Sequence, residues 1–193
     1  MIGTGFVSLP LYCILLPNLP GNSPDDAVPT DNEDFQNIQN DKHIKYFKLP
    51  EKSGWNAGRA VLLSQVTTEY FITCDDDFLF NKETKVETFL DIIGKTGFDV
   101  IGGGVGQNTL NYWRKIARYD IKLGSTGHCV SRKNGFYGQL VKYPDCHVGD
   151  IIANFFIART LTAGSIRFDP LFTQMAHREY FLDGTGQLRI AVW

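Results

Sequence analysis

The middle of the chain reads Tyr70-Phe71-Ile72-Thr73-Cys74-Asp75-Asp76-Asp77-Phe78, an apolar run that ends abruptly in three carboxylates. A near-continuous apolar run of this length is typical of a central strand that is covered on both faces. The segments on either side of it have helical periodicity. These apolar stripes are Ala60, Leu62, Leu63 and Val66 before the run, and Val86, Phe89, Leu90 and Ile93 after it. Phe98–Ile101 then reads as another strand. Alternation at this spacing predicts an α/β fold with a mixed, mainly parallel central sheet.

Further outward, one helix is expected to start at Gly54. A second is expected to start at Asn81, which is a fair N-cap residue. Short strands are expected at 44–49, 151–157 and 187–192, and short helical segments at 158–163 and 177–183. Residues 108–142 show no clear period and are expected to form strands and loops around Gly124, Gly127 and Gly135. Residues 18–42 are rich in acids and turn formers, which favours an exposed loop. We therefore expect an atypical N-terminal segment and acidic loop over 1–43 and the α/β domain over 44–193.

The composition excludes several classes of protein. The chain has 193 residues, of which 43% are hydrophobic and 21% charged, as in one globular domain. A net charge of −2 provides no overall positive field for a nucleic acid, so no nucleic-acid partner is expected. The four cysteines, which are too few for a disulfide scaffold, are Cys13, Cys74, Cys129 and Cys146. They form no CxxC pair, which argues against a structural zinc site. Nor does any stretch reach the roughly 18 to 20 apolar residues of a membrane span.

The apolar stretch Phe6–Leu16 contains Pro10 and has no basic residue before it. A secretory signal peptide normally begins with a basic segment. A buried strand or a truncated start of the chain is therefore favoured over a cleavable signal.

The three carboxylates at the end of the apolar run are the strongest chemical feature. Like charges side by side are stable only when they are solvated or neutralised by a cation. Oxygen ligands alone select a hard cation such as Mg²⁺ or Mn²⁺, and strand ends of α/β sheets are where ligands bind. A solvated acidic turn is the alternative, but the position directly after a buried strand favours a metal site.

Other motifs are weaker. The run Gly102-Gly103-Gly104-Val105-Gly106 follows a strand, but Gln107 breaks the GxGxxG pattern and no helix pattern follows. We read it as a close backbone approach or a bend. The histidines have no HExxH spacing, so a zinc hydrolase is not supported.

Several blocks together resemble the β-1,4-N-acetylgalactosaminyltransferases of glycosyltransferase family 12, in the order found in that family, over roughly residues 44 to 192. These blocks are Gly54–Arg59, Ser64–Tyr70, Asp75–Phe78, Val100–Gly103, Asn154–Arg159, Phe168–Pro170 and Ala176–Gly184. The last of them looks like the family's His-x-Glu-Phe-Phe-x-Asp-Gly signature. The same order is similar, more loosely, to the wider group of GT-A transferases. The resemblance implies a GT-A-like nucleotide-diphospho-sugar transferase fold.

The resemblance also implies an activity: transfer of N-acetylgalactosamine from UDP-GalNAc to a galactose-containing glycan or glycolipid, with inversion. By analogy, Asp75 and Asp77 reach Mn²⁺ or Mg²⁺, and Asp76 faces the donor. Gly58 and Arg59 lie beside the nucleotide. These roles agree with the chemistry, because a UDP leaving group needs a divalent cation to hold its growing charge.

An inverting transfer needs a general base on the acceptor side, and Glu179 and Asp183 are the candidates in the last block. They are four residues apart, so on a helix they share a face. Glu179 is preferred because it opens the short helix. In its place before the last strand it also resembles the acidic residue that inverting GT-A transferases often use as base. The alternative is that Glu179 only caps the helix.

The resemblance leaves some expectations open. Family domains begin with a further strand and helix and continue beyond the position of Trp193, where they have a cysteine. We therefore expect the fold to be incomplete at both ends. Family members are Golgi type II membrane proteins, although no anchor is visible in this sequence. If the chain is secretory, Cys129 and Cys146 should be oxidised, with each other or with cysteines elsewhere. A homodimer is left open. The competing functions are a non-catalytic fragment of the fold and a Mg²⁺-dependent nucleotidyltransferase that uses the same acidic strand end.

Overall fold

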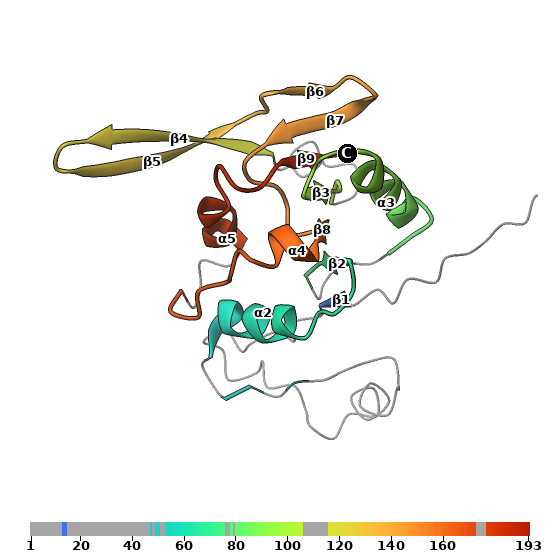
Figure 1. Ribbon diagram of the computed structural model, residues 1–193, viewed down its shortest axis with the longest axis horizontal. Helices are drawn as coiled ribbons and strands as arrows, with labels where there is room; N and C mark the ends of the chain where they lie inside the picture. The colour runs from blue at the N-terminus through green and yellow to red at the C-terminus, as the bar shows by residue number, and fades with distance from the viewer. Residues whose placement is uncertain are drawn as a thin grey trace, which may run out of the picture.

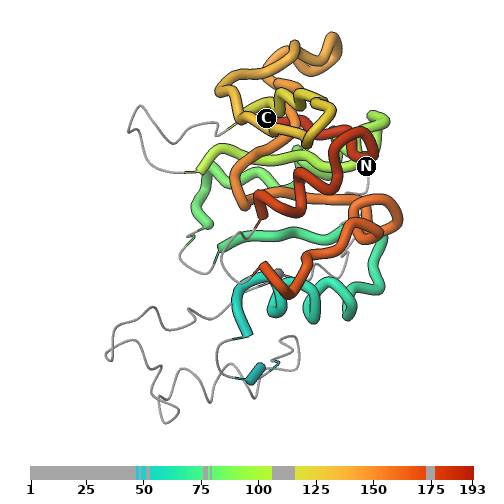
Figure 2. The backbone as a smooth tube through the Cα atoms, turned by 90° about the vertical axis from the view of Figure 1, so that its left-hand side faces the viewer, coloured from blue at the N-terminus to red at the C-terminus, as the bar shows by residue number. Residues whose placement is uncertain are grey.

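The computed structural model describes residues 13–14, 47, 49–50, 53–75, 78, 80–105, 116–172 and 177–193. Within these residues the central sheet has seven strands in the order β1-β2-β8-β3-β9-β7-β6. They are β1 (Cys13–Ile14), β2 (Tyr70–Thr73), β3 (Val100–Gly102), β6 (Gly138–Leu140), β7 (Tyr143–Gly149), β8 (Phe156–Arg159) and β9 (Ile190–Val192). Figure 2 shows the segments stacked, with residues near 55–75 at the bottom and those near 140 at the top.

The α/β class and the mixed sheet are confirmed, but the expectation of a mainly parallel sheet was wrong. Two neighbouring pairs, β1–β2 and β3–β9, are parallel, and the other four are antiparallel. The reason lies in how the chain enters β8. It returns to the sheet at the end where β2 and β3 finish, so that Phe156 pairs with both Thr73 and Gly102, and β8 must run back between its neighbours.

Helices cover both faces of the sheet (Figure 1). The helix α3 (Val86–Lys95) packs Phe89, Ile92 and Ile93 against one face, together with Ile101 of β3. The other face is covered by α2 (Gly54–Ser64), α4 (Thr160–Ala163) and α5 (His177–Asp183). Large aromatic side chains of α5 lie in this second core, where Tyr180 and Phe181 are fully buried. Phe71 and Ile72 of β2 lie in the two opposite cores, so this strand is covered on both faces, as its sequence predicts.

Most of the predicted elements are confirmed, with shifted ends. The helix expected from Asn81 begins only at Val86, because the Asn81 side chain accepts the Glu83 N–H at 2.8 Å and holds a separate turn before the helix. The strand expected at 151–157 is β8, at 156–159. Ile151 instead pairs with Ala117 in an isolated bridge at the base of the β4–β5 ribbon.

Residues 117–134, within the segment without a clear period, form that ribbon, a long antiparallel pair of β4 (Ala117–Gly124) and β5 (Gly127–Asn134). It projects from the body of the molecule (Figure 1). Cys129 is exposed on β5 and Cys146 is buried on β7, and the structure has no disulfide between these two cysteines. In the part of the chain that the structure describes, no helix is long and apolar enough to cross a membrane. The predicted acidic loop at 18–42 lies outside the described residues.

The glycine run after β3 is explained by packing. A Cβ atom on Gly102 would lie 2.5 Å from Ile152 Cδ1, and one on Gly103 would lie 2.5 Å from Phe89 Cζ. Side chains at these positions would collide with the core, so the close-approach interpretation of the glycines is supported at these two positions.

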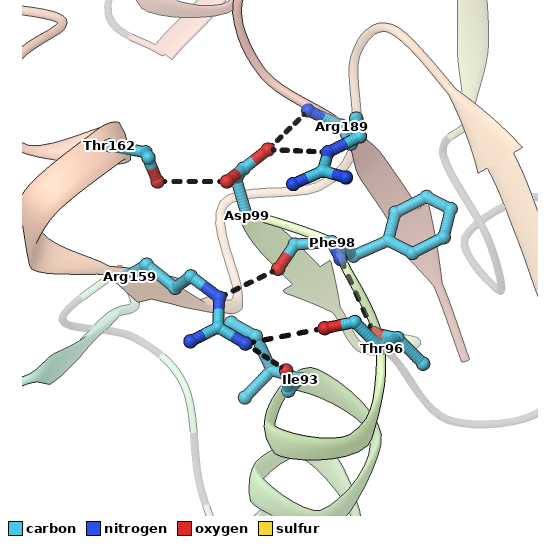
Figure 3. Close-up of polar contacts among 7 residues, drawn as sticks. All are labelled: Ile93, Thr96, Phe98, Asp99, Arg159, Thr162 and Arg189. Carbon is cyan, nitrogen blue, oxygen red and sulfur yellow. Dashed lines mark hydrogen bonds and ion pairs between the residues drawn. The ribbon is translucent and has the colours of Figure 1, made fainter.

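A network of hydrogen bonds connects strands and helices at the end of the sheet where β3 starts (Figure 3). Asp99 accepts hydrogen bonds from Thr162 Oγ1 at 2.9 Å and from the Arg189 backbone N–H at 2.9 Å. Beside it, Arg159 donates to the Phe98 carbonyl at 3.1 Å and to carbonyls at the end of α3, those of Ile93 and Thr96. We call this group, comprising Asp99, Arg159, Thr162 and Arg189, the clasp end. It ties α3, α4 and three strands together.

Candidate active site

At the opposite end of the sheet, α2 presents two buried polar side chains to two acidic residues. Gly54 has a φ of 81°, which favours glycine, and the helix follows directly. Asn56 is fully buried and Arg59 is 4% exposed, although both are polar. They are three residues apart and therefore lie on one face of the helix. Such groups are buried only when they have partners, and their partners are the acidic residues of the site.

Arg59 pairs with Asp75, the first of the three carboxylates after β2. Its Nη2 lies 3.0 Å from Asp75 Oδ1, and the side chain of Asp75 is 38% exposed. Asn154, just before β8, donates a hydrogen bond to the same oxygen. The Arg59 guanidinium also lies 5.8 Å from the centre of the Phe168 ring, close enough for a cation–π interaction. Asp75 is thus held from the interior while part of its carboxylate faces solvent.

Asn56 pairs with Glu179, which is 4% exposed on α5. The Asn56 Nδ2 donates to Glu179 Oε2 at 2.9 Å, and the backbone N–H of Asp169 donates to Glu179 Oε1 at 3.2 Å. Asn56 Nδ2 also lies 3.2 Å from the Asp169 carbonyl. Both carboxylate oxygens of Glu179 are therefore tied to elements outside its own helix, which is not the arrangement of a helix cap.

The surroundings of Glu179 alter its protonation. Burial raises the pKa of the Glu179 carboxyl to about 7. The neighbouring carboxyls of Asp183 and Asp169 raise the pKa as well, whereas the hydrogen bond from the Asp169 N–H lowers it. A carboxyl that titrates near neutral pH is suited to accept a proton in a reaction.

The structure brings some of the predicted site residues together. Arg59 lies against Asp75, and Asp183, which is exposed, lies near Glu179 on α5. Gly58 is buried on α2 beside Arg59. Asp76 and Asp77 lie outside the described residues. Among the residues that are described, no group of three His, Cys, Asp or Glu side chains could hold a metal ion.

Sequence reasoning missed Asn56 and Asn154 as site residues. Both stand inside blocks that carry the family resemblance, Gly54–Arg59 and Asn154–Arg159. A signal was available for Asn56, because it is a polar residue three positions from Arg59 and therefore on the same helix face. Asn154 carries no local signal, since its contact with Asp75 depends on β8 lying next to β2.

Comparisons with known proteins identify the family of the chain. Residues 21–160 match the family model described as glycosyl transferase family 2. The mouse protein beta-1,4 N-acetylgalactosaminyltransferase 1 is 38% identical over 165 residues, which are 84% of this chain and 31% of that protein. The mouse protein beta-1,4 N-acetylgalactosaminyltransferase 2 is 35% identical over 178 residues, which are 92% of this chain and 34% of that protein.

The chain therefore spans about a third of the length of these curated relatives. A crystal structure of S. aureus TarS 1–349 is similar with a TM-score of 0.49 and 19% identity, over 82% of this chain and 43% of that one. The family match agrees with the GT-A-like fold predicted from the sequence. Because the family model matches most of its length, the chain belongs to glycosyl transferase family 2.

Proposed function

We propose that the chain forms part of an inverting transferase that moves N-acetylgalactosamine from UDP-GalNAc to a galactose-containing glycan or glycolipid. The single observation that carries this proposal is the buried Glu179 carboxyl, held by Asn56 and Asp169 and titrating near pH 7. The donor sugar is suggested by the names of the relatives, which are N-acetylgalactosaminyltransferases.

In the proposed reaction Glu179 acts as the general base. Its carboxylate takes the proton of the acceptor hydroxyl while that oxygen forms a bond to the anomeric carbon of the sugar. The bond between this carbon and the UDP oxygen breaks, and UDP leaves with the bonding electron pair. Attack from the side opposite UDP inverts the anomeric configuration. Asp183, exposed and near Glu179, is the alternative base.

Asp75 and Asp77 are proposed to hold Mn²⁺ or Mg²⁺. Asp75 fits such an ion because it offers a carboxylate at a strand end, partly open to solvent and held in place by Arg59 and Asn154. A bound cation would neutralise the charge that develops on the departing diphosphate. Asp76 and Gly58 are proposed to lie on the donor side. Arg59 acts there by holding Asp75, with which it pairs, rather than through a free guanidinium.

The deciding experiment measures transfer from a panel of UDP-sugars, with Mn²⁺, to a galactose-terminated acceptor. We expect transfer from UDP-GalNAc above the other donors, and UDP with Mn²⁺ should raise the melting temperature. Thermal stabilisation without transfer would favour the non-catalytic fragment. Stabilisation by a nucleoside triphosphate with Mg²⁺, and none by UDP-sugars, would favour the nucleotidyltransferase.

Location and organisation are part of the same proposal. We place the protein in the Golgi because the resembling family resides there. The division into 1–43 and 44–193 remains a proposal, as does a homodimer. Light scattering of the purified chain measures the oligomeric state, and fluorescence microscopy of the tagged full protein tests the location.

A further inference from the structure

The Glu179 carboxylate is held by two donors that come from separate parts of the chain. One is the Asn56 amide of α2, at 2.9 Å from Oε2, and the other is the Asp169 backbone N–H, at 3.2 Å from Oε1. The same Asn56 amide lies 3.2 Å from the Asp169 carbonyl. Asn56 therefore joins α2, the loop at Asp169 and the carboxylate in one closed set of contacts.

The position of Asn56 is itself constrained. The residue is fully buried, and one helical turn later Arg59 is anchored to Asp75. Rotation of α2 about its axis would therefore disturb both acidic residues together. The helix α2 therefore fixes the positions of Glu179 and Asp75 relative to each other.

Stability alone does not explain an asparagine at this position. Its Oδ1 is buried and has no hydrogen-bond partner among the described residues, which is unfavourable for folding. An apolar side chain of similar size would avoid that cost. The Nδ2 donor, directed at Glu179 and Asp169, is the favourable contact that asparagine makes here and that such a residue lacks.

We infer that Asn56 is a positioning residue for the proposed reaction: its amide orients the Glu179 carboxylate and favours the ionised form that accepts a proton. This inference rests on the proposed function, since it concerns the same base. Burial favours the neutral acid, and a hydrogen bond donated to the carboxylate acts in the opposite direction. Asn56 thus keeps a buried carboxyl usable as a base near neutral pH.

The test compares Asn56→Leu, which keeps the number and branching of the side-chain heavy atoms and removes the donor, with Asn56→Ser, whose hydroxyl is too short to replace the amide. The Glu179 pKa is followed by NMR of protein with ¹³C-labelled glutamate, and the Glu179→Gln spectrum assigns the signal. Both Asn56 variants should raise the Glu179 pKa by about one unit. The acidic limb of the kcat/KM profile should move to higher pH by the same amount.

Tyr180→Phe is the matched control. Tyr180 is fully buried on α5 next to Glu179, and its hydroxyl donates to the Ala163 carbonyl. The substitution removes this hydrogen bond and none of those made by Glu179. This variant should be less stable but should leave the Glu179 pKa and the acidic limb unchanged. An equal shift in Tyr180→Phe would show that general loosening of α5 explains the effect, and would overturn the inference.

The outcomes separate the inference from the proposed function. An unchanged carboxyl pKa in Asn56→Leu or Asn56→Ser, together with an inactive Glu179→Gln, would overturn the inference about Asn56 alone. Full transfer by Glu179→Gln would instead overturn the base assignment, and with it the catalytic meaning of Asn56. A raised pKa in both Asn56 variants, with the acidic limb moved equally, would support both.

Discussion

Two Asp–Arg pairs stand at opposite ends of the sheet, and their burial is inverted. At the clasp end the Asp99 side chain is 3% exposed and Arg189 is 66% exposed. At the other end, which we call the site end and which comprises Asn56, Arg59, Asp75, Asn154 and Glu179, Asp75 is 38% exposed and Arg59 only 4%. The clasp directs its carboxylate into the protein, and the site end directs its carboxylate towards solvent.

The difference indicates what each carboxylate serves. Both oxygens of Asp99 accept hydrogen bonds from the chain itself, from Thr162 and Arg189 (Figure 3). A carboxylate satisfied in this way stabilises the fold. Asp75 is held on its inner side by the buried guanidinium of Arg59. Burying that charge costs desolvation energy, so the pair is a weak source of stability. We interpret the clasp end as structural and the site end as functional.

The largest effect that would sharpen this comparison is expected from Glu179→Gln. Glutamine keeps the shape of the side chain but cannot take a proton. Turnover should fall by roughly 10²- to 10⁴-fold, with little change in UDP affinity. Single-turnover rates and calorimetric UDP affinity check this, with Asp183→Asn measured beside it. Near-normal turnover in Glu179→Gln and none in Asp183→Asn would reverse the two roles.

Asp75→Asn tests whether the exposed carboxylate serves a cation. Asparagine keeps an oxygen for Arg59 and Asn154 but loses the charge, so Mn²⁺-dependent UDP affinity should fall by roughly 100-fold. Titration of UDP with and without Mn²⁺ measures the effect. Because Arg59 loses its neutralising partner, some loss of melting temperature is expected as well. An unchanged UDP affinity would contradict the assignment of Asp75.

Asp99→Asn is the matched substitution at the clasp end. The substitution replaces one carboxylate oxygen by an NH2 group, which cannot accept a hydrogen bond. Either Thr162 or Arg189 therefore loses its acceptor, and the free energy of unfolding should fall by about 2–3 kcal/mol. UDP affinity, measured on the folded protein, should stay the same. Urea unfolding followed by circular dichroism gives the first quantity. A large loss of UDP affinity here would break the separation of the two ends.

The smallest effect concerns pH. Since the pKa of Glu179 is about 7 in the folded protein against a usual 4.5, the folded state binds more protons than the unfolded state between these values. This carboxyl therefore lowers the free energy of unfolding as pH rises from about 4.5 to 7. The proposed activity should rise as pH increases through about 7, because Glu179 must lose its proton to act as the base.

Thermal unfolding across this range should show the loss in the wild type and a smaller loss in Glu179→Gln, which lacks the titrating group. The difference between the two proteins isolates Glu179 from other acids that titrate nearby. Parallel curves for the two proteins would mean that the Glu179 pKa is not raised.

The sequence by itself determined the class of fold and most of its elements. The stripes on α2 and α3, the buried β2 and the short α5 are local patterns, because helix and strand periods are written in neighbouring residues. The acidic end of β2 was also available from sequence, and so was the proposal that Glu179 is a site residue. So was the family, through blocks of residues in their order.

Tertiary structure decided what depends on contacts between distant residues. The direction of β8 reversed the expected parallel order, since strand direction is set by where the chain re-enters the sheet. The pairing of Arg59 with Asp75, of Asn154 with Asp75 and of Asn56 with Glu179 joins residues 16, 79 and 123 positions apart. No local period carries such information. The burial that raises the pKa of Glu179 likewise exists only once α5, α2 and the Asp169 loop have packed together.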